Sequence, residues 1–226
     1  MNRQGNTYTF LYSVVLVVVV AALLSVISLS LQPRQNENKQ NEKRQNILSA
    51  IHISSTAENS AELFDKYIKE QFIVNAKGKK VEGNAFNVSI ATQYNLPVEK
   101  RELPVFVAEI EGAVKYILPI YGAGLWGPIW GYISLDANKD NIYGTFFDHQ
   151  GETPGLGAEI TTPQFNNQFQ NKQVFSGDQL VGIAVVKGGN ATGTHEVDAI
   201  SGGTITSKGV EKMLKNYLTY YEPFLK

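Results

Sequence analysis

The chain opens with an uninterrupted apolar run. Residues 10–31 contain no charged side chain, and residues 14–20 are almost entirely valine. At about 1.5 Å per helical residue, the run extends roughly 33 Å, enough to cross a hydrocarbon core of about 30 Å. A cleaved signal peptide is the alternative, but its apolar core is usually about 7–15 residues long, and no Ala-x-Ala cleavage site follows this run. The pattern therefore favours a retained transmembrane anchor over residues 1–31.

A polar stretch separates this run from the rest of the chain. Eight of the fifteen residues 32–46 are Asn or Gln, so the segment cannot bury a core. We expect an exposed helix or stalk there. Apolar residues return at Ile47, Leu48 and Ile51, and they predict that one globular domain occupies residues 47–226.

The domain begins with helical periodicity and continues with short strands. Residues 57–70 carry an apolar stripe that predicts a helix, and residues 72–81 contain a turn that predicts a hairpin. Two more hairpins are predicted, one across residues 105–118 and one across residues 131–147. A further strand is expected at residues 180–186.

The chain ends in a clear helical pattern. Apolar residues recur there at the spacing i, i+3, i+4, i+7, i+8, namely Val210, Met213, Leu214, Tyr217 and Leu218. This spacing predicts an amphipathic helix. The resulting fold class is α+β: one N-terminal transmembrane helix, followed by an antiparallel-sheet domain with flanking helices.

Composition removes several kinds of chemistry. The chain has no cysteine, which excludes a disulfide scaffold, a thiolate zinc site, an iron–sulfur cluster ligated by this chain and a cysteine nucleophile. The formal net charge is −1, which argues against nucleic-acid binding, because that function needs a concentrated basic surface. The three histidines are widely scattered, which disfavours a histidine-rich metal centre.

Three segments are rich in glycine where a plain sheet does not need it. Residues 121–131 combine glycines with two tryptophans, residues 149–159 contain Thr-Pro-Gly-Leu-Gly, and residues 198–207 combine two glycines with four hydroxyls. None matches a G-x-G-x-x-G dinucleotide fingerprint or a G-x-x-x-x-G-K-[ST] phosphate loop. Ser201 lacks the G-x-S-x-G elbow of a serine hydrolase. A bend between strands and a solvated loop remain the alternatives for the first two segments.

The third segment lies directly before the C-terminal helix. Free amides, a favourable dipole and little side-chain bulk at a helix N-terminus are what a phosphate site requires. N-capping by Thr206 or Ser207 is the alternative, and it explains one hydroxyl but not four. The residues therefore favour a phosphate site at this helix end.

Together the three segments resemble a known family. Residues 198–204, Asp-Ala-Ile-Ser-Gly-Gly-Thr, resemble the D-x-x-[ST]-G-A-T flavinylation motif of bacterial FMN-binding domains, and residues 152–157 resemble the E-T-P-G-L-G segment of the same domains. Residues 118–131, and the layout of one span plus one domain, are similar to the C subunit of the sodium-translocating NADH:quinone oxidoreductases. One departure is Gly203, which stands where the family usually has alanine.

The resemblance implies an antiparallel-sheet FMN-binding domain in which a separate flavin transferase joins FMN covalently, through its phosphate, to Thr204. Thr206 and Ser207 are the runner-up hydroxyls. No catalytic side chain and no metal ligand is expected, because the flavin carries the redox chemistry. The other predicted cofactor-binding residues are Asp198, Ser201, Gly202, Gly203, Thr206, Glu152, Thr153, Gly155, Leu156, Gly157, Leu125 and Trp126.

The function that the resemblance implies is that of an electron carrier in the sodium pump, with the other subunits and membrane lipid as partners. Two alternatives stay open: the equivalent FMN subunit of a ferredoxin:NAD electron-transport complex, and a flavin-free, membrane-anchored ligand-binding domain. The family places the domain on the outer side of the bacterial inner membrane, whereas the Lys and Arg residues after the span, by the positive-inside rule, would keep it in the cytoplasm. The span itself contains no charged residue, so we expect no sodium path through it.

Overall fold

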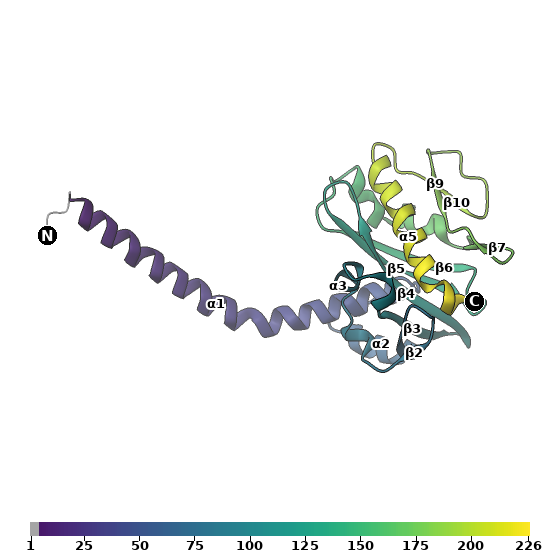
Figure 1. Ribbon diagram of the computed structural model, residues 1–226, viewed down its shortest axis with the longest axis horizontal. Coiled ribbons are helices and arrows are strands. Elements are labelled where there is room, and N and C mark those ends of the chain that lie inside the picture. Colours follow the sequence, from purple (N-terminus) through teal and green to yellow (C-terminus); the bar gives the residue numbers. More distant parts are fainter. Residues whose placement is uncertain (1–4) are drawn as a thin grey trace. The chain divides into compact units, whose positions relative to one another are not determined.

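The computed structural model describes residues 5–226, so that the first four residues of the predicted anchor lie outside the described part. The chain forms two compact units, Met1–Lys43 and Arg44–Lys226. The 44-residue helix α1 (Asn6–Ser49) contains both the apolar run and the polar stretch after it (Figure 1). By length and composition this helix is able to cross a membrane, and the apolar side chains of the run are exposed. The boundaries expected at residues 31 and 46 stay predictions.

The globular unit is built on a six-stranded sheet. Its strand order is β2-β1-β3-β4-β5-β6, and all neighbours in it are antiparallel. The three predicted hairpins are confirmed as β1–β2, β3–β4 and β5–β6. The strands are β1 (Ile68–Val74), β2 (Lys80–Val81), β3 (Leu103–Ile110), β4 (Ala113–Ala123), β5 (Pro128–Asp136) and β6 (Ile142–His149).

Alternate residues of the central strands enter two separate hydrophobic cores. On β3, Val105 belongs to one core and Phe106 to the other, and on β4 Leu118 and Ile117 divide in the same way. Because successive side chains of a strand point to opposite faces, the two cores lie on opposite faces of the sheet. Helix α5 (Thr204–Leu225) supplies residues to the first core, and α2 (Ser60–Tyr67), with the last residues of α1, supplies the second.

The remaining elements are short and lie in the connections. β7 and β8 pair antiparallel, and β9 and β10 pair parallel. The elements are α3 (Ile90–Tyr94), α4 (Pro163–Asn166), β7 (Phe175–Ser176), β8 (Gln179–Leu180), β9 (Ala184–Val186), β10 (Glu196–Asp198) and the 3-10 helices η1 (Ala85–Asn87), η2 (Val98–Lys100), η3 (Gly157–Thr161) and η4 (Asn167–Phe169).

Two predicted elements are wrong in part. The helix expected over residues 57–70 ends at Tyr67, because Ile68 begins β1 and pairs with β3. The strand expected over residues 180–186 is divided into β8 and β9, since Gly182 adopts a φ of 69° between them. At Ile68, pairing with a distant strand outweighs the local helical pattern.

Helix α5 is fixed to the sheet by an apolar stripe and by one buried hydroxyl. All five residues of the predicted stripe are buried, as the spacing required. The hydroxyl of Tyr221 donates a hydrogen bond of 2.7 Å to the carbonyl of Pro104 on β3. Complete burial raises the pKa of Tyr221 well above its usual value, so this hydroxyl remains a donor.

We expect Tyr221→Phe to lower the free energy of unfolding by about 1–2 kcal/mol, because it leaves a buried carbonyl without its donor. Chemical denaturation of the detergent-solubilised chain measures this loss. Tyr220→Phe is the matched control: Tyr220 packs against the same core but is only half-buried, so removal of its hydroxyl should change the stability little. Equal losses in the two variants would contradict the role given to Tyr221.

Candidate functional site

The N-terminus of α5 presents an exposed hydroxyl next to unsatisfied amides. Thr204 is the first residue of the helix, and its side chain is exposed. The N-cap residue is Gly203, and no side chain caps the first turn, so the alternative of capping by Thr206 or Ser207 is wrong. The first amides of a helix have no acceptor within it, and together they carry about half a positive charge. An anionic group attached at Thr204 would lie beside them.

The two runner-up hydroxyls are buried and already hydrogen-bonded. Thr206 is 1% exposed, and its hydroxyl donates to Glu152 Oε2 at 2.5 Å. Ser207 is fully buried, and its hydroxyl accepts a hydrogen bond from the amide of Ile200 and donates one to the carbonyl of Gly203. Of the four hydroxyls in this segment, those of Ser201 and Thr204 are therefore the accessible ones.

A cavity of about 420 Å³ lies beside Thr204, a size typical of small-molecule sites. The three glycine-rich segments converge on it, and ten of the thirteen predicted cofactor-binding residues are among those that line it. The lining residues are Leu125, Trp126, Glu152, Thr153, Leu156, Gly157, Gly202, Gly203, Thr204, Ile205 and Thr206.

Apolar side chains form an exposed rim around this cavity. Trp126 is 70% exposed and Ile205 is 61% exposed, and Leu125 and Leu156 are exposed as well. Large apolar residues gathered at one surface point mark a binding site, because each would be more stable if a ligand covered it. Sequence reasoning missed Ile205. The available signal was an apolar residue in the first turn of the helix, off its buried stripe.

The β4–β5 hairpin positions Trp126. Ala123 pairs with Pro128 at the end of these strands, and the amide of Gly124 donates to the carbonyl of Gly127 at 2.8 Å. The loop is therefore tight, and its two middle residues extend outward from the sheet. Leu125 and Trp126 occupy those two positions, which explains their exposure.

A buried carboxylate joins this loop to α5. Glu152 is 5% exposed, its Oε1 accepts a hydrogen bond of 2.9 Å from the amide of Trp126, and its Oε2 accepts the hydroxyl of Thr206. The amide of Glu152 donates to His149 Nδ1 at 3.2 Å, which holds the turn before it. One side chain thus fixes the relative positions of all three glycine-rich segments.

Glycines allow these close approaches. A Cβ at Gly124 or Gly157 would collide with the Glu152 carboxylate, and Gly202 adopts a φ of 75°, which favours glycine. At Gly203, where the family usually has alanine, a Cβ would lie 2.9 Å from the Ile200 side chain and 3.0 Å from the Leu156 carbonyl. Glycine therefore permits a tighter packing of this loop than alanine would.

Three predicted site residues lie elsewhere. Gly155, Asp198 and Ser201 line a separate cavity of about 690 Å³, which has a polar wall that includes Glu159. Asp198 accepts hydrogen bonds of 2.9 and 3.0 Å from the amides of residues 190 and 191, so in this structure its carboxylate orders that loop. Their assignment to the cofactor stays a prediction.

Comparisons with known proteins agree on a family. The family model described as the FMN-binding domain matches residues 124–219, which include every residue of the cavity. The C subunit of the Na(+)-translocating NADH-quinone reductase of Vibrio vulnificus (strain YJ016) is 31% identical over 92% of this chain and 89% of its own length. This chain belongs to the family of C subunits of Na(+)-translocating NADH-quinone reductases. The same subunit from Haemophilus ducreyi is 29% identical over 95% of this chain and 90% of its own length.

Two solved structures of this family have the same fold. The protein of the same name from Parabacteroides distasonis superposes with a TM-score of 0.82 at 47% identity, over 87% of this chain and 97% of the other. Shewanella oneidensis NqrC gives a TM-score of 0.70 at 25% identity, over 82% of this chain and 97% of the other. The resemblance expected from the three motifs is thereby confirmed, and the antiparallel-sheet domain with its flanking helices is confirmed with it.

The chemistry of the cavity fits FMN. The exposed rim offers flat apolar surface to a ring system, and the first turn of α5 offers amides and a hydroxyl to a phosphate. Among the described residues, no group of three or more His, Cys, Asp or Glu side chains is placed to hold a metal ion.

We expect Gly157→Ala to destabilise the chain by about 1–3 kcal/mol, because the added Cβ collides with the carboxylate of Glu152 and the hydroxyl of Thr206. Gly151→Ala is the control, since a Cβ there meets nothing within 4 Å. Thermal unfolding of the two variants measures the difference. If both variants have the same melting temperature as the unaltered chain, the close packing at Glu152 does not contribute to stability.

Proposed function

We propose that this protein carries electrons on an FMN attached through its phosphate to Thr204, as one redox centre of a sodium-pumping NADH:quinone reductase. The observation that carries the proposal is an exposed hydroxyl at the N-terminus of a 22-residue helix, beside an apolar-rimmed cavity, within the matched FMN-binding domain. The relatives from Vibrio vulnificus and Haemophilus ducreyi indicate the reaction, and the residues of this chain supply the site.

The helix end suits a phosphodiester at Thr204. Such a linkage keeps one negative charge, which the dipole of α5 stabilises by about 0.3–1 kcal/mol at an exposed position. The amides of the first turn are available as donors, because no side chain caps them. A covalent tether also removes the loss of translational freedom that reversible binding would require. A cavity with an exposed rim is then sufficient to retain the cofactor.

The remaining lining residues would orient the ring. Trp126 offers a flat apolar surface and Leu156 a branched one, each on a different glycine-rich segment. Ile205 adds a third apolar side chain on the helix itself. When bound, the flavin supplies the redox chemistry. No side chain of this chain is required to act as an acid or base, so the role of the protein is to bind, to orient and to set the electrostatic surroundings.

Three partners would act on this chain: a flavin transferase, the other subunits of the complex and the membrane lipid. A separate flavin transferase would attach the FMN, which requires that Thr204 be reachable from solvent, and its side chain is exposed. The other subunits would donate and accept the electrons. Helix α1 would anchor the chain as a single pass in the lipid of the inner membrane, with the globular unit on the outer side.

We expect Thr204→Val to abolish covalent flavin, because valine has nearly the shape of threonine but no hydroxyl. The full chain is expressed with a flavin transferase and denatured, and it is then tested for in-gel flavin fluorescence and for the mass of FMN on the peptide that holds Thr204. Thr204→Ser is the matched control, since it keeps a hydroxyl at the same place and should keep the label.

The other outcomes of this experiment are also informative. A label that persists in Thr204→Val would move the attachment to another hydroxyl, Ser201 being the other accessible one in the segment. Absence of flavin from the unaltered chain would overturn the carrier function and favour a flavin-free ligand-binding domain.

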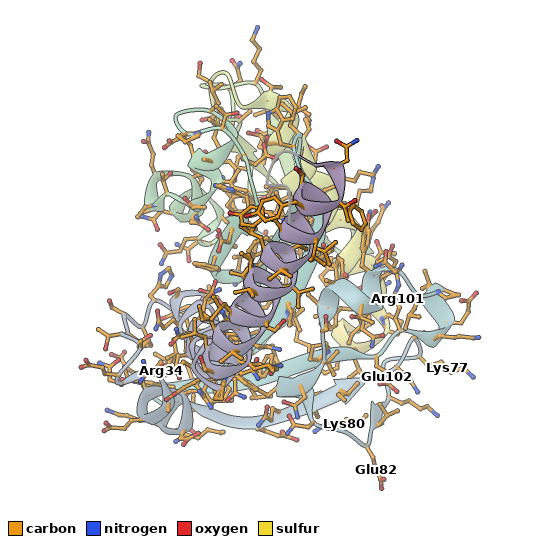
Figure 2. The ribbon with its side chains drawn as sticks, turned by 90° about the vertical axis from the view of Figure 1, so that its left-hand side faces the viewer. Arg34, Lys77, Lys80, Glu82, Arg101 and Glu102 are labelled. Atoms are coloured by element: carbon orange, nitrogen blue, oxygen red, sulfur yellow. The ribbon has the colours of Figure 1, made fainter. Side chains whose placement is uncertain are left out.

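The orientation can be tested with introduced cysteines, because the chain has none of its own. Lys77 is exposed in the turn between β1 and β2, at the rim of the globular unit in Figure 2. We expect Lys77→Cys to react with a membrane-impermeant maleimide in intact spheroplasts, and Asn6→Cys, at the start of α1, to react only after lysis. The reverse pattern would place the domain in the cytoplasm.

A further inference from the structure

The cavity wall contains a buried carboxylate that has no cationic partner. Glu152 is 5% exposed, yet none of the salt bridges among residues 5–226 involves it. Buried carboxylates are usually paired with a cation, because removal of a charge from water is costly. An unpaired one that lines a binding site therefore requires an explanation.

The hydrogen bonds of Glu152 suit the ionised form. Both of its carboxylate oxygens act as acceptors, one from the amide of Trp126 and one from the hydroxyl of Thr206. An ionised carboxylate has only acceptor sites, which matches the two hydrogen bonds that Glu152 accepts. The two contacts thus stabilise the carboxylate of the ionised form, and neither donor is a cation that would neutralise it.

The surrounding backbone keeps this charge in one place. Gly124 and Gly157 approach the carboxylate so closely that a Cβ at either position would collide with it. Its two donors belong to the β4–β5 loop and to α5, which are the elements that carry Trp126 and Thr204. The charge therefore has a fixed position relative to the attachment point and to the apolar rim of the cavity.

From this arrangement we infer that Glu152 is a positioning residue whose charge lowers the reduction potential of the flavin, an inference that rests on the proposed function. Each electron that a flavin accepts without a proton adds one negative charge to the ring. A fixed negative charge in the adjacent, poorly hydrated wall repels that added charge and makes reduction less favourable. The electrons come from the neighbouring redox centres of the complex, and the carboxylate itself is neither oxidised nor reduced.

The test is the midpoint potential of the flavin in Glu152→Gln, a variant of nearly the same shape without the charge. The flavin-loaded full chain is titrated with dithionite and mediator dyes while the flavin absorbance is recorded. At a fixed ambient potential, we expect the ratio of reduced to oxidised flavin to rise at least tenfold, which for a two-electron couple is a positive shift of about 30 mV.

Two further variants separate charge from structure. Glu152→Asp keeps the charge but shortens the side chain, so the potential should remain close to that of the unaltered chain even if stability falls. Glu159→Gln removes one charge from the wall of the other cavity, and it should change the ratio less than threefold. Shifts of equal size in Glu152→Gln and Glu159→Gln would overturn the inference, as would a Glu152→Asp shift as large as that of Glu152→Gln.

Flavin occupancy, measured by mass, distinguishes this inference from the proposed function. A chain that carries flavin at Thr204 but keeps its potential in Glu152→Gln would overturn the role of Glu152 alone. A chain that never carries flavin would overturn the proposed function and this inference together. The apo forms of the unaltered chain and of Glu152→Gln should melt at similar temperatures, since glutamine is able to bond both Trp126 and Thr206.

Discussion

The hydrogen bonds of Glu152 are the constraint on which the geometry of the site depends. The sheet holds the β4–β5 loop at one end, and the apolar stripe of α5 holds the helix across one face. Neither of these elements alone fixes the distance between Trp126 and Thr204. The carboxylate does so, because it accepts one hydrogen bond from each element and is itself enclosed by glycines.

The periodicity of α5 explains which hydroxyl is accessible. Thr206 and Ser207 lie four and three residues before Val210, so they continue the buried stripe of the helix towards its N-terminus. Thr204 lies two residues before Thr206, about 200° around the helix axis, and therefore faces outward. The same rule places Ile205 away from the core, beside the cavity. Helical spacing alone could have ranked Thr204 above the two runner-up hydroxyls.

Local signals predicted the parts of the fold that local contacts stabilise. The hairpins have their turns within a few residues, and α5 has an unbroken stripe, so both were predictable. The end of α2 at Tyr67 depends on pairing with the distant strand β3, which a single sequence does not specify, and the division at Gly182 depends on the positive φ of that residue. The same distinction between local and distant contacts applies to the site. Glycine content predicted the three segments, but the contact between Glu152 and Thr206 depends on how the sheet and α5 pack together.

The exposed rim of the cavity is consistent with a cofactor that is held by a covalent tether, as proposed. An electron carrier must approach both its donor and its acceptor, and a deeply enclosed flavin would be insulated from both. An exposed rim such as that of Trp126 and Ile205 leaves the ring accessible, but apolar contacts of this extent would hold a free cofactor weakly. The proposed covalent bond at Thr204 would remove that conflict, because retention would no longer depend on burial. The protein would then be free to use the cavity wall, including the carboxylate of Glu152, to adjust the energy of the bound electron.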